Sequence, residues 1–469
     1  MSARIACAGL AAMLIAAALL FLRPPETAGG SLRDFQAYRA AGAAALAARD
    51  PYAADIASDE SLLPPGAMLP FVGTPAALPF WMLLARLPAS DATIFWRAAL
   101  VIALIALVIA GALLAGVRTP FDLACLALIA LAFAPLTSAV ALGQTAIAGA
   151  AAAALALGLR TRVALWAGAF VAFCFQPNAA LGLLAALRRG GALTIGLGML
   201  ALYACGAAVR GAGWPLDYAH LLLAHAEAER VSALQYTPIA IARGFGLAQT
   251  LAATIAVAAG SVVTICAAWI TWRRSLYFGF AAISCALPFV CGFFHEQDFA
   301  ALFVPGIFTL RMVPATLRGP ALFAVVAIGA NWLDIAQSPP ALPQDLALGT
   351  ALIAACLATL PRIDARAVAW SVASATLLGL GTWVAAAHPL PVWPDAMRDF
   401  VQVPGATAAQ LWHAELAHTG LLAPNPASAV LRLFSLIGCT VLLGLLARAS
   451  DVHVHHVVER RDAVGVVAL

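Results

Sequence analysis

Long apolar runs separated by short polar stretches make up almost the whole chain, and this pattern constrains its fold most strongly. A helix needs roughly 20 apolar residues to cross a bilayer, and lipid offers no partners for free backbone groups. About 14 runs approach that length, namely those near 5–22, 93–117, 121–140, 144–159, 163–175, 177–187, 191–209, 249–271, 276–292, 298–311, 320–337, 346–361, 367–387 and 426–448. The sequence therefore predicts an all-α polytopic membrane protein with about 12–14 transmembrane helices.

Composition supports this class and excludes others. Charged residues make up 10% of the chain, whereas soluble domains carry roughly 25%. The chain contains no lysine, and no basic stripe with interleaved aromatic residues predicts nucleic-acid binding. The nine cysteines lie in apolar runs without a CxxC pair, so we expect small buried side chains rather than disulfides or a zinc site.

Residues 4–22 begin with a basic residue and continue as an apolar run, as a signal peptide does. The run is longer than a usual signal core, and the following "PPETAGG" offers no clear A-x-A cleavage site. We therefore expect an uncleaved first transmembrane helix.

The arginines predict the orientation, because cytoplasmic loops are enriched in basic residues. With the N-terminus inside, alternate crossing places one set on the cytoplasmic side: Arg118, Arg160, Arg162, Arg188, Arg189, Arg273, Arg274, Arg311, Arg318, Arg362, Arg366 and Arg448. The acidic residues fall mainly outside, among them Asp34, Asp50, Glu229, Glu296, Asp298 and Asp345. We expect both termini in the cytoplasm.

This orientation puts the long polar segments on the outer face: 23–92, 210–248 and 388–425. It requires residues 74–88 not to cross. That stretch is short and bounded by prolines, so we expect an interfacial or re-entrant helix. Because the cytoplasmic loops are short, we expect the chemistry on the outer face.

The stretch "GGSLRDFQAYRAAGAAALAARDPY", residues 29–52, gathers charge directly after the first apolar run. Ser31 can cap a helix, which puts Asp34 in the first turn, and the apolar spacing predicts an amphipathic helix over 32–48 on the outer membrane surface. Asp34 and Tyr38 are four residues apart and share a face. Asp34 either complements the helix N-terminus or serves as a catalytic carboxylate.

Two polar breaks interrupt apolar runs on the predicted outer side. In "ALGQTA", glycine suits a turn, and Gln144 either makes structural hydrogen bonds or binds substrate. In "CFQPNAAL", Pro177 ends a helix directly after Gln176. Such breaks at membrane depth are tolerated where they line protein or a cavity.

Two further segments carry candidate binding groups. "GFFHEQDFAAL" places His295, Glu296 and Asp298 in a tight loop, which is either a solvated turn or a site. Glu296 and Asp298 together offer oxygen ligands for a divalent cation. In the segment 210–248, Arg230 and Arg243 are candidates to hold a phosphate.

Nucleotide-binding motifs are absent from the sequence: it has no GxxxxGK[ST], no GxGxxG and no DxD pair. The predicted cytoplasmic loops are also too short to bind a nucleotide. We therefore expect no cofactor, and a substrate that comes from lipid or from the external space.

Taken in order, these motifs resemble glycosyltransferase family 87, the polyprenyl-phosphate-sugar-dependent mannosyltransferases of the C-type (GT-C) membrane glycosyltransferase superfamily. The matching residues are Asp34, Phe35 and Tyr38; Asp50, Pro51 and Tyr52; Gly143 and Gln144; Pro177; and His295 with Asp298. The resemblance covers roughly residues 1–315. The family often has a lysine where this chain has Gln176, and a Y-P-P-like element where it has Gly73, Thr74 and Pro75.

The resemblance implies a GT-C-like bundle in a bacterial inner membrane. Its implied reaction moves a hexose, such as mannose, with inversion from a polyprenyl-phosphate donor to a lipid- or glycan-linked acceptor on the extracytoplasmic face. Asp34 would be the catalytic base, with substrate contacts from Tyr38, Gln144, Gln176, Arg230, Arg243, His295 and Asp298. The expected organisation is a catalytic module over 1–315, additional transmembrane helices over 316–448 and a cytoplasmic tail over 449–469.

Chemistry agrees with a transferase, because a lipid phosphate leaves without a proton and one carboxylate base then suffices for the acceptor hydroxyl. A hydrolase normally needs two carboxylates. The first rival is a transporter or flippase, whose polar residues should lie at mid-membrane, whereas the apolar runs here are nearly free of charge. The second rival is an inactive membrane scaffold.

Overall fold

The structure is a computed structural model, and it describes residues 1–22, 32–58, 68–337, 341–393, 395–397 and 399–449. It is 79% helical, and no strand occurs in the described residues. Seven described helices are long and apolar enough to cross a membrane. They are α1 (Ser2–Leu20), α5 (Ala89–Leu114), α11 (Ala192–Arg210), α14 (Gln249–Arg273), α19 (Leu342–Thr359), α20 (Ala365–Ala387) and α22 (Pro426–Arg448). The chain therefore has the helices of a multi-pass membrane protein.

Full-length spans are fewer than the sequence predicts, because several apolar runs form short or broken helices. The run 121–140 forms α6 (Pro120–Ala132) and α7 (Ala134–Leu142), which are bent by 60° and count as one further span only as a pair. Pro135 lies in the first turn of α7, where its missing N–H ends the preceding helix. Other runs form α8 (Ala146–Gly158), α9 (Arg162–Phe175), α15 (Leu276–Val290), α16 (Phe303–Met312) and α17 (Arg318–Gly329).

Short helices fill the polar segments between these spans. The first polar segment contains α2 (Arg33–Leu46), α3 (Ala54–Ala57), η1 (Pro75–Ala77) and α4 (Leu78–Ala85). Later come α10 (Pro177–Ala180), η2 (Leu181–Arg189), α12 (Trp214–Glu229), α13 (Pro238–Gly244), η3 (Glu296–Leu302), η4 (Ala315–Leu317), α18 (Trp332–Gln337), η6 (Asp395–Met397) and α21 (Ala408–His418). Local chemistry starts many helices, as where the Thr237 and Thr407 side chains accept from the first-turn N–H groups of α13 and α21.

Helix α2 is more buried within the protein than its amphipathic pattern predicts, and its position at the membrane surface stays a prediction. It begins one residue later than predicted and buries a face of small residues inside the protein. Gly42 touches the backbone of α4, since a Cβ there would lie 2.4 Å from the carbonyl carbon of Trp81. Small residues let α2 approach α4 this closely. The charged first turn of α2 therefore lies inside the protein. The predicted capping residue, Ser31, lies outside the described residues.

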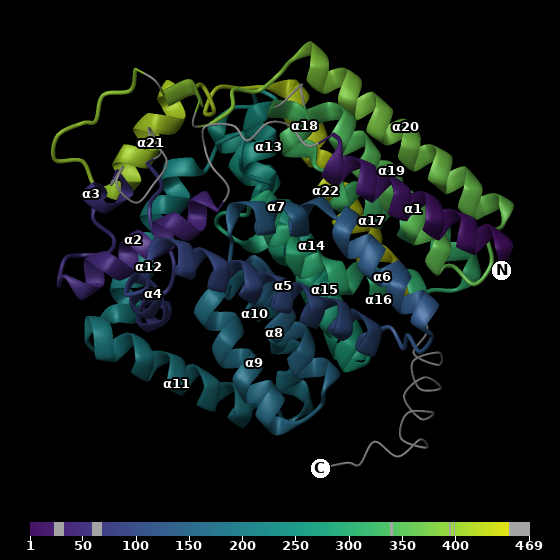
Figure 1. Cartoon of the computed structure of the whole chain (residues 1–469), viewed down its shortest axis with the longest axis horizontal. Helices are drawn as coiled ribbons and strands as arrows, with labels where there is room; N and C mark the ends of the chain where they lie inside the picture. The colour runs from purple at the N-terminus through teal and green to yellow at the C-terminus, as the bar shows by residue number, and fades with distance from the viewer. Residues whose placement is uncertain (23–31, 59–67, 338–340, 394, 398, 450–469) are drawn as a thin grey trace.

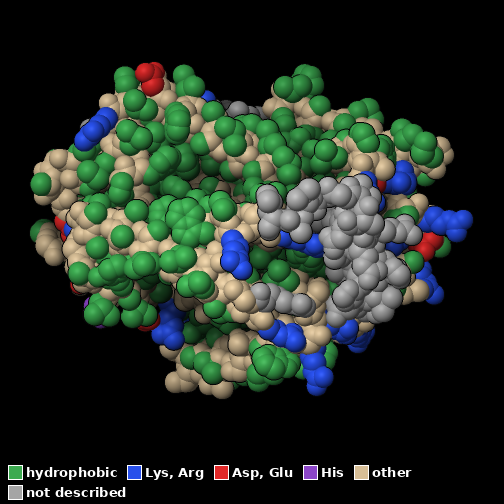
Figure 2. Space-filling view, turned by 90° about the horizontal axis from the view of Figure 1, so that it is seen from below, with side chains coloured by type: hydrophobic (Ala, Val, Ile, Leu, Met, Phe, Trp, Pro, Cys, Tyr) green, Lys and Arg blue, Asp and Glu red, His purple; other side chains and the backbone are tan. Residues whose placement is uncertain are grey.

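Lipid-facing side chains can be recognised on the long helices. On α5, Val101, Ile102, Ile105 and Ile109 form one exposed stripe at helical spacing. Apolar side chains cover most of the face seen in Figure 2. Exposed apolar surface of this extent is the expected exterior of a protein that lies in a bilayer.

The first helix packs against the end of the chain. Helix α1 lies along α19, more than 300 residues later, and Figure 1 shows the two side by side. Helices α17 and α22 also pack together, and α15 contacts α22. The expected division at residue 315 therefore separates segments that are packed against each other.

Arginines join the helix ends that the sequence analysis assigned to the cytoplasm. Arg4 contacts Asp122 at the start of α6, and Arg311 lies 3.7 Å from the same carboxylate. Arg274 donates to the carbonyl of Ala447 at 3.0 Å. At the other ends of the spans, short helices from the polar segments gather on one side of the molecule (Figure 1): α2, α3, α4, α12 and α21. The polar segments thus converge, and the side of the membrane that they face stays a prediction.

Candidate active site

Asp34 lies in the first turn of α2 and is almost completely buried, with 4% of its surface exposed. The N–H of Leu32, directly before the helix, donates to the carbonyl of Ala141 in α7 at 2.7 Å. Phe35 stacks on Trp96 of α5, with ring centroids 5.7 Å apart. These contacts hold the charged N-terminus of α2 within the helix bundle.

The turn between α7 and α8 is built around a glycine. Gly143 has a φ of +76°, and a Cβ there would lie 2.8 Å from Cβ of Phe35. Its carbonyl accepts a hydrogen bond from the indole of Trp96 at 2.9 Å. Only glycine suits both the conformation and the contact, so this turn sets how closely Gln144 approaches α2.

Gln144 connects two predicted site residues. Its amide nitrogen donates to Oδ2 of Asp34, and its amide oxygen accepts from the hydroxyl of Tyr38 at 2.6 Å. Both ends of the amide are therefore used, which fixes its orientation. Oδ1 of Asp34 is buried and makes no hydrogen bond, so one carboxylate oxygen is left for a further partner.

Arg33 provides the nearest positive charge to this carboxylate. Its Nε lies 3.5 Å from Oδ1 of Asp34, and its guanidinium stacks over the ring of Trp393 at 4.7 Å. Glu415 of α21 is fully buried, and neither of its oxygens is hydrogen bonded. Burial raises the pKa of Glu415 to about 9, although the charge of Arg33 opposes this. The charge of Arg33 thus acts on the carboxyls of both Asp34 and Glu415, and Glu415 stays protonated at neutral pH.

Burial also tunes Asp34 itself. It raises the pKa of the carboxyl above the ordinary aspartate value, while the Arg33 charge and the hydrogen bond from Gln144 hold it lower. A base works best when its pKa lies near the operating pH, because it then combines an ionised form with proton affinity. Burial therefore makes the Asp34 carboxylate a stronger proton acceptor than an ordinary exposed aspartate.

A second cluster forms where α9 ends. Gln176 follows the last residue of α9 and donates its amide to Oδ1 of Asp298. Gly149 of α8 makes room for it, because a Cβ there would lie 2.3 Å from Cβ of Gln176. Thr145 binds the carbonyl of Phe175 at 2.7 Å and so joins this break to the Gln144 turn. Gln176 therefore positions a carboxylate.

His295 lies at the centre of the second cluster. Its Nε2 is 3.0 Å from Oε2 of Glu229 and 2.9 Å from the amide nitrogen of Gln235, and its backbone N–H donates to Oδ2 of Asp298 at 2.8 Å. Burial lowers the pKa of His295, but the Glu229, Asp298 and Asp34 carboxylates outweigh it and raise the pKa to about 9. The imidazole is therefore positively charged at neutral pH.

The two clusters belong to one site. The charges of Asp34 and His295 each shift the pKa of the other. Burial raises the pKa of Tyr38, and the carboxylates of both Asp34 and Asp298 raise it further. The structure thus brings together Asp34, Tyr38, Gln144, Gln176, His295 and Asp298 from four separate stretches of the chain.

The two predicted phosphate-binding arginines lie apart from this site. Arg230 forms a surface ion pair with Glu227 at 3.0 Å, and Arg243 donates to the carbonyl of Leu247 at 2.5 Å. Neither hydrogen bonds to a residue of the two clusters in the part of the chain that the structure describes. The arginine beside Asp34 is instead Arg33.

Glu296 and Asp298 take part in different clusters, although they are two residues apart. Burial raises the pKa of Glu296, and the nearby Asp334 raises it further. Asp334 and Asp345 both accept from the amide of Asn331, at 3.2 and 3.1 Å. Within the described ranges, no group of three or more His, Cys, Asp or Glu side chains has the arrangement of a metal site. The geometry therefore does not support a cation shared by Glu296 and Asp298.

Several residues of the site were not predicted as site residues: Arg33, Glu229, Gln235 and Glu415. Arg33 is adjacent to Asp34, and Glu229 is one helical turn after His225, so the sequence held a weak signal for both. Gln235 and Glu415 become visible only when the segments 210–248 and 388–425 are placed against η3 and α2.

Comparison with known protein families, with curated proteins and with solved structures found no match for this chain. Its function is therefore argued from the geometry of the site.

Proposed function

We propose that this chain is an integral-membrane glycosyltransferase that moves a sugar from a polyprenyl-phosphate donor to an acceptor hydroxyl, with Asp34 as the general base. The observation that carries the proposal is the environment of Asp34. Its carboxylate is buried, one oxygen is held by Gln144 and the other is free of hydrogen bonds. That Oδ1, which has only the Arg33 Nε at 3.5 Å beside it among the described residues, can take the proton of an acceptor hydroxyl as the new glycosidic bond forms.

The stoichiometry of the reaction suits a single base. The acceptor oxygen attacks the sugar carbon, its proton passes to Asp34, and the bond from the sugar to the lipid phosphate breaks. The phosphate departs as an anion and needs no proton, so no second acid has to lie opposite. Attack on the face opposite the phosphate gives inversion. The transferred sugar is proposed to be mannose or another hexose, and the acceptor a lipid- or glycan-linked hydroxyl.

Arg33 is the residue best placed for the leaving phosphate. Its guanidinium is oriented by the Trp393 ring and by that residue's carbonyl at 3.4 Å. A guanidinium offers several donors to phosphate oxygens, and such charge-assisted hydrogen bonds are strong. Gln176, which replaces the lysine of the resembled family, already donates to Asp298. In this proposal, Arg33 therefore supplies the cation that Gln176 lacks.

A proton-coupled transporter is the second candidate, because the carboxyls of Glu296, Asp334 and Asp345 are clustered and Asp345 has a buried oxygen without a partner. Titratable groups on a transport path should lie near the middle of the spans. These groups lie at helix ends instead: Glu296 opens η3, and Asp345 is in the first turn of α19. Their position favours the transferase.

The test measures transfer of labelled sugar from polyprenyl-phosphate mannose, and separately from polyprenyl-phosphate glucose, to a membrane-extracted acceptor by the purified full chain. Asp34→Asn keeps the side-chain shape and removes the base, so the rate should fall by about 10²- to 10⁴-fold. Asp55→Asn is the matched control, because Asp55 is exposed and its carboxylate pairs, among the described residues, only with Arg49 at 3.3 Å. A wild type that transfers neither sugar, or an Asp34→Asn variant of normal rate, contradicts the proposal.

A further inference from the structure

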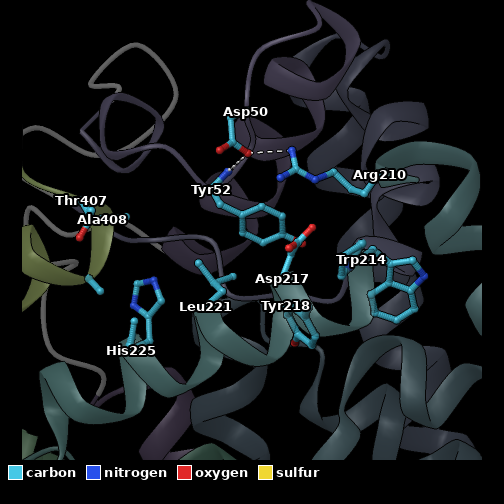
Figure 3. Close-up of a pocket in the computed structure, with 13 residues that line it drawn as sticks. Asp50, Tyr52, Arg210, Trp214, Asp217, Tyr218, Leu221, His225, Thr407 and Ala408 are labelled. Carbon is cyan, nitrogen blue, oxygen red and sulfur yellow. Dashed lines mark hydrogen bonds and ion pairs between the residues drawn. The ribbon is translucent and has the colours of Figure 1, made fainter. Parts of the chain in front are cut away.

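A pocket opens beside the active site where the three long polar segments meet (Figure 3). Its volume is about 300 Å³, at the lower end for ligand pockets in proteins. The lining comes from the stretch around Asp50, from the end of α11, from α12 and from the start of α21. No residue of this lining has a part in the proposed reaction, so the pocket requires its own explanation.

Aromatic rings form much of the wall, and each is fixed by its polar end. The hydroxyl of Tyr52 donates to the carbonyl of Gly73 at 2.9 Å. The hydroxyl of Tyr218 donates to the carbonyl of Val72 at 3.0 Å. The indole of Trp214 is likewise hydrogen bonded, and its ring lies 6.2 Å from that of Tyr218. The ring faces are thus preorganised surfaces rather than loose side chains.

Charged groups stand around these rings. Arg210 pairs with Asp50 at 2.9 Å, and its guanidinium lies 5.5 Å from the centre of the Tyr52 ring. Asp217 is exposed and lines the pocket, and its carboxylate makes no hydrogen bond or ion pair with any residue that the structure describes. The pocket therefore offers two carboxylates and one guanidinium.

His225 gives the clearest sign of a missing ligand. It is 1% exposed, it lines the pocket, and its Nε2 is buried without a hydrogen-bond partner. Figure 3 shows its imidazole projecting from α12 toward the segment of Thr407 and Ala408. A buried polar atom without a partner destabilises the protein, so a ligand that supplies the missing hydrogen bond gains affinity. Burial lowers the pKa of His225, which leaves a neutral ring that can donate and accept.

We propose that this pocket binds a neutral sugar unit of the acceptor glycan. Two carboxylates disfavour a phosphate or another anion, and Arg210 disfavours a cation. The unpaired polar groups disfavour a plain lipid tail. A neutral sugar fits all three constraints, because its hydroxyls pair with Asp217 and His225 while its C–H face covers an aromatic ring.

The position of the pocket indicates which sugar unit it takes. His225 is one turn before Glu229, the partner of His295, so α12 forms a wall common to both sites. On another side, the ring of Phe71 lies between Tyr52 of the pocket and Tyr38 of the active site, 5.2 and 6.2 Å from them. Asp34 does not line the pocket. The bound unit is therefore a sugar other than the one that reacts, and its role as part of an acceptor rests on the proposed function.

The experiment measures binding without catalysis. The sugar-binding proposal can therefore be contradicted while the proposed transferase function still holds. The full chain in lipid nanodiscs is titrated with radiolabelled mannobiose, maltose and lactose, and with a disaccharide that carries a uronic acid. At least one neutral disaccharide should bind at least about tenfold more tightly than the acidic one. Binding of none of the neutral disaccharides, or tighter binding of the acidic one, would overturn the proposal.

Variants then locate the binding. Asp217→Ala removes an unpaired pocket carboxylate and should weaken binding of the neutral disaccharide by about tenfold or more. His225→Gln should weaken it while the thermal unfolding temperature shows that the fold is kept. Glu227→Gln, on the same helix but outside the pocket, is the matched control. Asp34→Asn should bind the disaccharide normally, which separates the pocket from the catalytic base. Unchanged binding in both pocket variants contradicts the assignment.

Discussion

Gln144 donates its amide to the carboxylate of Asp34 across 110 residues of sequence, and the hydroxyl of Tyr38 holds the other end of the same amide. An amide fixed at both ends cannot turn over without losing both bonds. Oδ2 of Asp34 is therefore held by the protein, and Oδ1, which lies 3.5 Å from Nε of Arg33, is the oxygen left for the proposed acceptor hydroxyl. In this proposal, the protein holds the catalytic carboxylate through one oxygen and leaves the other oxygen for the acceptor.

The pH dependence of transfer follows from the burial of Asp34. Its pKa is raised, and only the ionised form accepts a proton, so the rate should fall as pH falls through a midpoint above the usual aspartate range. Gln144→Glu places a second carboxylate beside it and should move this midpoint to higher pH. Initial rates from about pH 4 to about pH 9 give the midpoint, with Asp55→Asn as the control. A flat acid limb in the wild type would exclude Asp34 as the base.

Arg33 is predicted to act on the donor. Arg33→Gln removes a charge-assisted bond to the donor phosphate, which is about 1.5–3 kcal/mol, so KM for the donor should rise by about 10- to 100-fold. The pKa of Asp34 should also rise, because the Arg33 charge now holds it down. Arg230→Gln, on the surface beside Glu227, is the matched control. Equal KM values for the two variants would assign the phosphate to another residue.

His295 is expected to be charged in the folded protein, and Glu229 is the main cause. Glu229→Gln should lower the pKa of His295 from about 9, because burial alone lowers it. Labelled histidine followed by NMR across pH measures this shift, and Glu227→Gln is the control. A His295 signal that titrates at the same pH in both variants would show that Glu229 has no such effect.

The same pKa shift makes a prediction about stability. The folded-state pKa of His295 is about 9, above its ordinary value of about 6.5. The stabilisation is therefore complete below about pH 6.5 and is lost as pH rises through about 9. Thermal unfolding of the wild type should show this decline, and His295→Gln should flatten it. A wild-type curve no steeper than that of the variant would contradict the charged state.

The orientation in the membrane is predicted from the arginines. A reporter fused directly after residue 189 should read cytoplasmic, and one inserted within residues 215–240 should read external. The second position lies on α12 and its following loop, beside the proposed active site. If either reporter reads the opposite side, the predicted orientation is wrong. A site on the cytoplasmic face would require a different donor.

Hydropathy predicted the helical membrane architecture, because long apolar runs have few alternatives in lipid. It overestimated the number of full spans, since a break such as that before Pro135 is a local event inside a continuous apolar run. The burial of α2 was missed for a related reason. Its small residues permit contact with α4, but only the folded structure shows which helix arrives there.

The sequence indicated which residues belong to the site better than it indicated which of them contact each other. Asp34, Gln144 and His295 were recognisable as polar groups in apolar surroundings. That Gln144 reaches Asp34, and Gln176 reaches Asp298, depends on how close the helices come at Gly143 and Gly149. The two hydrogen bonds join residues 110 and 122 positions apart in the sequence, and no local pattern encodes them.

The packing of α1 on α19 has a consequence for biogenesis. A chain is made from its N-terminus, so the first helix enters the membrane long before its partner at Leu342–Thr359 exists. Until then, α1, whose buried residues include Ala11, Ile15 and Ala18, has α6 as a neighbour but lacks α19. The order of synthesis therefore differs from the order of assembly: a helix made early reaches its final packing only when a much later helix is in place.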